Sequence, residues 1–109
     1  MKYGVLWSVG QFYPLQVLSR NGRWYQVKDF EGDVGWIHRE LTSKIPAVVV
    51  SARSANIRSG PGSRYQVRFV AERGSTFKIL KKAGEWIRVR HADGDRGWVH
   101  RKLLWGLED

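Results

Sequence analysis

Short runs of alternating apolar and polar residues follow one another along this chain, and turn-forming residues separate them. Alternation with a period of two predicts strands that bury one face, and no segment shows a convincing helical stripe. In the second half we predict strands at 55–58, 66–71, 76–82, 86–91 and 96–100. The predicted turns are Ser59-Gly60-Pro61-Gly62, Arg73-Gly74, Ala83-Gly84 and Ala92-Asp93-Gly94-Asp95, the last with the Asp-Gly signature of a hairpin. The pattern therefore predicts an all-β protein.

An internal repeat organises the chain. When the sequence is shifted by 62 positions, residues 2–41 align with 64–103 without a gap, and 13 of the 40 pairs are identical. The identities begin with Tyr3 and Val5, which align with Tyr65 and Val67. A long period present only twice indicates tandem small domains rather than a solenoid. We assign residues 1–44 to the first unit and 45–109 to the second.

The first unit lacks its opening strand. Residues 54–62, which open the second unit, would align with positions before Met1. Three explanations compete: truncation of a longer protein, a strand supplied by 47–51, or a strand supplied by a neighbouring molecule. We favour truncation, but an unpaired strand edge also makes a homodimer or strand exchange possible.

Composition and charge limit the possible functions. A chain of 109 residues is too short for a large catalytic domain, and without cysteine it can form neither disulfides nor a thiolate metal site. The net charge of +9 favours anionic partners. Residues 1–44 contribute 6 − 4 = +2 and residues 45–109 contribute 13 − 6 = +7, so the second unit would dominate such binding. The sequence contains no stretch long enough to span a membrane, and its start has no secretory signal peptide.

Two tryptophans are predicted on polar strand faces. In the predicted strand 86–91, Ile87 and Val89 point to the core, so Trp86, Arg88 and Arg90 share the opposite face. Trp24 is placed in the same way in the first unit. An exposed indole is a candidate platform for a sugar, a proline or a base, although it could also cap the core.

A second repeated motif borders these platforms. Gly35-Trp36-Ile37-His38 recurs as Gly97-Trp98-Val99-His100. Trp98 and His100, and likewise Trp36 and His38, could flank the platform tryptophan, or the tryptophan could simply fill the mouth of a barrel. Each histidine stands alone, without metal-ligand or nucleophile spacing, so we predict no catalytic residue, no metal and no cofactor. Ser59-Gly60-Pro61-Gly62 lacks the Lys-Ser/Thr of a phosphate-binding loop and is predicted to be a turn.

Three sequence blocks resemble the bacterial SH3 family, also called SH3b or SH3 type 3. They are Ala55-Asn56-Ile57-Arg58-Ser59-Gly60-Pro61-Gly62, Gly84-Glu85-Trp86-Ile87-Arg88-Val89 and Gly97-Trp98-Val99-His100-Arg101-Lys102-Leu103-Leu104. The resemblance covers 55–104 fully and 2–41 without the opening block. It implies two tandem SH3-like β-barrels, the first lacking its opening strand, in an exported protein of the cell envelope.

The resemblance also implies a binding role. Trp24 and Trp86 resemble the tryptophan that lines the peptide groove of eukaryotic SH3 domains. His100 stands where those domains have a proline, and Ala55-Asn56-Ile57-Arg58 replaces their tyrosine-rich block, so binding of Pro-rich peptides in the eukaryotic manner is not expected.

We therefore expect a non-enzymatic module, periplasmic or extracellular, that binds a peptidoglycan-derived peptide or glycan, or a protein partner. The expected ligand-binding residues are Trp24, Trp36, His38, Trp86, Trp98, His100, Arg88 and Arg90. One alternative is a scaffold that dimerises through open strand edges. Another, ranked last, is an anionic-polymer or nucleic-acid binder, because the aromatic scheme is shared by both units while the strong charge is not.

Overall fold

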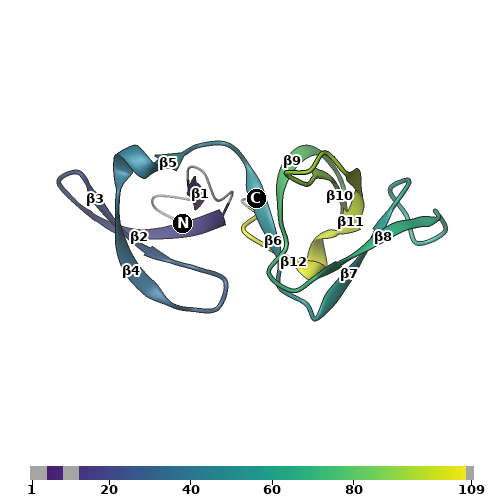
Figure 1. Cartoon of the computed structure of the whole chain (residues 1–109), viewed down its shortest axis with the longest axis horizontal. Helices are drawn as coiled ribbons and strands as arrows, with labels where there is room; N and C mark the ends of the chain where they lie inside the picture. The colour runs from purple at the N-terminus through teal and green to yellow at the C-terminus, as the bar shows by residue number, and fades with distance from the viewer. Residues whose placement is uncertain (1–4, 9–12, 108–109) are drawn as a thin grey trace.

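The computed structural model describes residues 5–8 and 13–107 and confirms an all-β architecture with two antiparallel sheets (Figure 1). The first sheet contains β1 (Val5–Ser8), β2 (Tyr13–Asn21), β3 (Trp24–Lys28), β4 (Val34–His38) and β5 (Thr42–Ser43), in the order β4-β3-β2-β1-β5. The second contains β6 (Ala47–Val50), β7 (Ser54–Arg58), β8 (Val67–Glu72), β9 (Thr76–Ala83), β10 (Trp86–Arg90), β11 (Arg96–His100) and β12 (Leu104–Trp105), in the order β12-β6-β9-β10-β11-β7-β8. Short 3₁₀ turns, η1 (Arg39–Leu41) and η2 (Arg101–Leu103), follow β4 and β11.

Most of the predicted repeat is also a structural repeat. Strands β3, β4 and β5 have their counterparts in β10, β11 and β12, each 62 residues later. The β2–β3 and β9–β10 ladders share an irregularity, in which the pairing passes over Leu18 in one sheet and Leu80 in the other. Both leucines are exposed, as expected of residues at a β-bulge. The two sheets thus share register as well as strand order in this part.

The repeat does not extend to the first strand as the ungapped alignment predicts. β1 pairs with β2 and β5, and β6 pairs in the same way with β9 and β12. In these ladders Leu6 faces Leu15, whereas Val48 faces Phe77. β1 is therefore the counterpart of β6, and the alignment of Val5 with Val67 is wrong. Tyr3 lies outside the described residues.

The first sheet lacks a counterpart of β7, as predicted from its missing opening block. In the second sheet β7 pairs with β11 and with β8. In the first sheet, over the described residues, β4 is the outermost strand on that side (Figure 1). The explanation that residues 47–51 supply the missing strand is wrong, because 47–50 form β6 of the second sheet.

The two sheets differ in the size of their cores. The second sheet encloses nine buried residues: Val48, Val50, Ala55, Ile57, Ala71, Phe77, Ile87, Val89 and Val99. The first encloses Leu6, Val17 and Val27, with Leu15, Tyr25 and Ile37 packed against them. Hydrophobic stabilisation scales with buried apolar area, so the second sheet has the larger share.

The sheets also contact each other, because β2 lies against β6. Trp105 was expected to pack rather than extend into solvent, and it does so, half-buried and paired with Val49 in β12. The described residues contain no helix with the length and apolar character that crossing a membrane requires.

Candidate functional site

A groove of about 1090 Å³ opens on the second sheet beside Trp86. One wall comes from β7 and the loop 59–65, and the other from the start of β10, the end of β11 and η2. The lining residues are Ser54, Asn56, Arg58, Pro61, Gly62, Ser63, Arg64, Tyr65, Trp86, His100, Lys102 and Leu103. The groove thus combines two aromatic rings with several hydrogen-bonding groups, a composition typical of ligand sites.

The loop wall is held in place by Tyr65 and Arg58. The Tyr65 ring lies so close to the loop backbone that a Cβ at Gly60 would overlap it, and one at Gly62 would lie 3.3 Å from Cδ2. Arg58 Nη1 donates hydrogen bonds to the carbonyl oxygens of Ser63 and Tyr65, both at 3.0 Å. The Ser-Gly-Pro-Gly segment is a turn, as predicted, and its glycines allow the aromatic side chain to cover it.

The opposite wall is a tryptophan–histidine pair. Trp86 and His100 are register partners on β10 and β11, with ring centroids 5.2 Å apart and planes at 76°. His100 also caps η2, because its Nδ1 accepts a hydrogen bond from the backbone N–H of Lys102 at 3.1 Å. That bond selects the neutral tautomer with its proton on Nε2, which is a donor. The predicted proximity of Trp86 and His100 is therefore confirmed.

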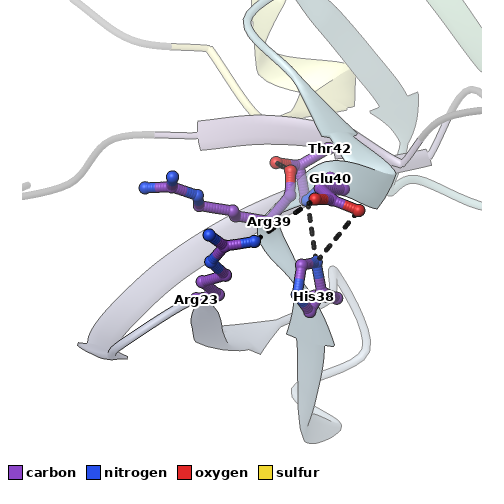
Figure 2. Close-up of polar contacts among 5 residues, drawn as sticks. All are labelled: Arg23, His38, Arg39, Glu40 and Thr42. Carbon is purple, nitrogen blue, oxygen red and sulfur yellow. Dashed lines mark hydrogen bonds and ion pairs between the residues drawn. The ribbon is translucent and has the colours of Figure 1, made fainter.

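The first sheet repeats this pair (Figure 2). Trp24 and His38 have centroids 5.4 Å apart at 79°, and His38 Nδ1 accepts from the backbone N–H of Glu40 at 3.2 Å. Figure 2 also shows Arg23 Nη1 beside Glu40 Oε1, at 3.8 Å. At the positions 62 residues later the charges are exchanged, since Arg23 corresponds to Glu85 and Glu40 to Lys102.

The second wall is what distinguishes the two tryptophans. β7 and its loop enclose Trp86, which is half-buried. Trp24 is 49% exposed and lies on a sheet whose described strands end at β4. The two tryptophans were predicted as equivalent platforms, and they share a strand position and a histidine neighbour but differ in enclosure.

The remaining predicted residues lie farther along the same strand face. Arg88 is opposite Trp98 and Arg90 is opposite Arg96 in the β10–β11 ladder. These side chains are not among those that line the groove at Trp86. Trp36, the counterpart of Trp98, is 52% exposed. The structure thus brings Trp86 and His100 into one groove and leaves Arg88, Arg90 and Trp98 outside it.

Sequence analysis did not single out Tyr65, Arg58 or Lys102 as site residues. Arg58, Arg64 and Lys102 bring positive charge to the groove, and its lining contains no acidic residue. Carboxylates and phosphates are the groups that such a surface attracts. The paired glycines before Tyr65 were the available signal, because a Gly-x-Gly turn followed by an aromatic residue permits this close packing.

An acidic turn lies at the other end of the β10–β11 hairpin. Asp93 Oδ1 accepts a hydrogen bond from the backbone N–H of Asp95 at 3.0 Å and lies 3.0 Å from Nδ1 of His91. The backbone hydrogen bond, followed by contact with the His91 side chain, lowers the pKa of Asp93.

We expect an NMR titration to find the Asp93 carboxyl pKa below that of an ordinary aspartate. Because the folded-state pKa is depressed, the carboxylate stabilises the turn above the unfolded-state pKa, and this contribution is lost as pH falls through the lower folded-state value. Asp93→Asn should remove the effect, and an unshifted midpoint in the native chain would contradict it.

Comparison with known proteins agrees with the sequence blocks and the fold. The sequence model of the family described as "Bacterial SH3 domain" matches residues 1–44 and 51–106. The chain belongs to the bacterial SH3 domain family. Its two sheets are therefore a tandem pair of SH3-like barrels, and the first lacks the strand equivalent to β7.

Similar curated proteins of this bacterial SH3 chain are named as amidases. Over 64 residues it is 35% identical to "Putative N-acetylmuramoyl-L-alanine amidase YrvJ" of Bacillus subtilis (strain 168), covering 59% of this chain and 12% of that protein. Over 60 residues it is 36% identical to "Probable cell wall amidase LytH" of Staphylococcus epidermidis, covering 54% of this chain and 21% of that protein. The chain thus spans about a fifth or less of the length of these relatives.

Among solved structures, the chain is similar to NlpC2 from Trichomonas vaginalis, with 19% identity and a TM-score of 0.47. The similarity covers 86% of this chain and 35% of that one. The assignment of this chain to the bacterial SH3 family rests on the family match and not on this structure.

Proposed function

We propose that this chain is a non-catalytic binding module that holds a bacterial envelope protein on the cell wall. The groove at Trp86 would bind a peptide or glycan fragment derived from peptidoglycan. The observation that supports this most directly is the walled groove itself, with an indole–imidazole pair on one side and Tyr65 on the other. The cell-wall amidases among the relatives point to the same class of ligand.

The chemistry of the groove suits a wall peptide that has a free carboxylate. The Trp86 ring offers a flat apolar surface for a sugar face or an alkyl side chain. His100 supplies an Nε2–H donor, because its Nδ1 is occupied by the cap of η2. Lys102 and Arg64 are both exposed at the rim and would attract the carboxylate.

Within this proposal the two barrels play unequal roles. The groove needs the wall formed by β7 and the loop 59–65, and the first sheet has no described strand in that place. Trp24 would bind a wall fragment more weakly than Trp86, since it contacts the ligand from one side only. The matched positions of the two tryptophans provide an internal control.

We expect Trp86→Leu to weaken the binding of a soluble disaccharide-peptide muropeptide at least tenfold, because it removes the central aromatic contact. Trp24→Leu, at the equivalent position, should change the affinity about twofold or less. Tryptophan fluorescence would give the affinities, and amide NMR shifts should cluster at 58–65, 86 and 100–103. Thermal unfolding of both variants would show whether the fold is intact.

Two outcomes would contradict the proposal. Native protein that gives no response at millimolar muropeptide would argue against wall binding, and equal losses in the two variants would argue against the Trp86 groove. An anionic polymer such as heparin, if it binds equally well and with a steep fall in affinity as salt rises, would favour the polymer-binding alternative.

A further inference from the structure

We infer that the free edge of β4 is a second binding site, which accepts an extended peptide strand from another polypeptide and so completes the first barrel. The second barrel is the template, because there β7 occupies the equivalent edge, antiparallel to β11, with Arg58 opposite Trp98. This site is separate from the groove at Trp86 and does not depend on what that groove binds.

A pair of repeated glycines supports the inference. Gly97 permits β7 to cross close to β11, since a Cβ there would overlap Ile57 Cγ2 and lie 2.9 Å from the Arg58 carbonyl oxygen. Gly35 is its counterpart in β4, and a Cβ on Gly35 would meet nothing within 4 Å. The first barrel thus has the glycine that a crossing strand needs, without a crossing strand among the described residues.

The core of the first barrel lacks what such a strand would supply. In the second barrel, β7 contributes the fully buried Ile57 and the nearly buried Ala55 to the core. Val99 is fully buried beneath it, whereas the equivalent Ile37 is only half-buried. A donated strand with apolar residues at alternate positions would fill this space, as occurs in β-strand addition.

The surface around β4 is also unusually apolar. Val34, Trp36 and Leu41 are 54%, 52% and 54% exposed, whereas Trp98 and Leu103, the counterparts of the last two, are half-buried. Proteins commonly protect a sheet edge with proline or lysine, and β4 contains neither. Its edge thus has the exposed backbone and apolar surface that a docking strand requires.

The predicted occupant is a segment patterned like Ser54–Arg58, with a small residue and a β-branched residue facing inward and polar residues between them. Its backbone would pair with β4, and the inward residues would determine specificity. The probe is therefore an acetylated, amidated synthetic peptide with the sequence of residues 53–59, added to the full chain.

We expect this peptide to shift the amide resonances of residues 34–38 and to bind at least tenfold more weakly to Gly35→Ala. The added methyl group would block the approach of a strand, and it should not lower the free energy of unfolding because the space around it is empty. A peptide carrying Ile57→Asp should not bind. Trp86→Leu should leave peptide binding unchanged, which separates this site from the groove.

Three results would overturn the inference: no response of β4 amides at millimolar peptide, unchanged binding by Gly35→Ala, or shifts confined to 96–100. Light scattering tests a second copy as the occupant. A concentration-dependent dimer that Gly35→Ala dissociates would replace the peptide partner with another copy of this chain and would also overturn the inference as stated.

Discussion

Gly97→Ala should lower the free energy of unfolding of the second barrel by about 1–3 kcal/mol, the usual cost of overpacking a closely packed interior. The added methyl group would collide with Ile57 and with the backbone carbonyl of Arg58, and neither can move without shifting β7. Because β7 forms a wall of the groove, the same change should weaken ligand binding. Urea denaturation followed by amide NMR would measure the stability of each sheet.

Gly35→Ala is the matched control for this prediction. It occupies the same position in the first barrel, where a Cβ would meet empty space. Replacing a strand glycine with alanine reduces the entropy of the unfolded chain, so stability should stay the same or rise by up to about 1 kcal/mol. Equal destabilisation by the two substitutions would show that Gly35 is also covered by a strand.

Phe77→Ala is expected to cost about 3–5 kcal/mol and to unfold much of the second barrel. Phe77 is a large, almost fully buried side chain, packed at 6.5 Å from the Phe69 ring and edge-on to His91 at 5.4 Å. Its removal leaves a cavity that the surrounding strands cannot close. Hydrogen exchange should show lost protection in β6, β9 and β10.

Leu15→Ala tests the same position in the first barrel. Leu15 is half-buried against a core of only three buried residues, so its truncation should cost clearly less than that of Phe77. Amides of the first sheet should exchange faster than those of the second in the native chain. A larger loss for Leu15→Ala, or slower exchange in the first sheet, would contradict the difference in core size.

The strands of the second barrel were predictable because each alternates and is bounded by a turn. Predicted ranges such as 96–100 agree with β11, and 76–82 falls one residue short of β9. β6 was less visible, since its four residues are all apolar and all buried, with β9 and β12 beside it in the sheet and β2 packed against it. Alternation disappears where both faces of a strand are covered.

The first strand was misaligned for a related reason. The identity of Val5 and Val67 favours one pairing, but strand order depends on partners far away in sequence. An ungapped comparison cannot show that the segment joining β1 to β2 is about 20 residues shorter than the one joining β6 to β9, because 62 − 42 = 20 for the offsets of the flanking strands. Only the pairing of β1 with β2 and β5 shows it.

Half of the groove could be inferred from the sequence. Trp86 and His100 face the same way on adjacent strands, and alternation is enough to predict that. The other wall comes from residues near position 60, which the β7–β11 pairing brings across the barrel. Tyr65 and Arg58 could not be placed there by local pattern, because their position depends on long-range pairing.

The exchanged charges beside the two histidines affect how tandem barrels assemble. Similar neighbouring repeats can trade hairpins during folding and become trapped in mixed structures. In such a mixture Arg23 would face Lys102, and Glu85 would face Glu40, so like charges would meet at both junctions. Each mismatch between exposed charges is weak, but both would disfavour the mixed product relative to the native one. The inverted pair therefore helps each hairpin recognise its own barrel.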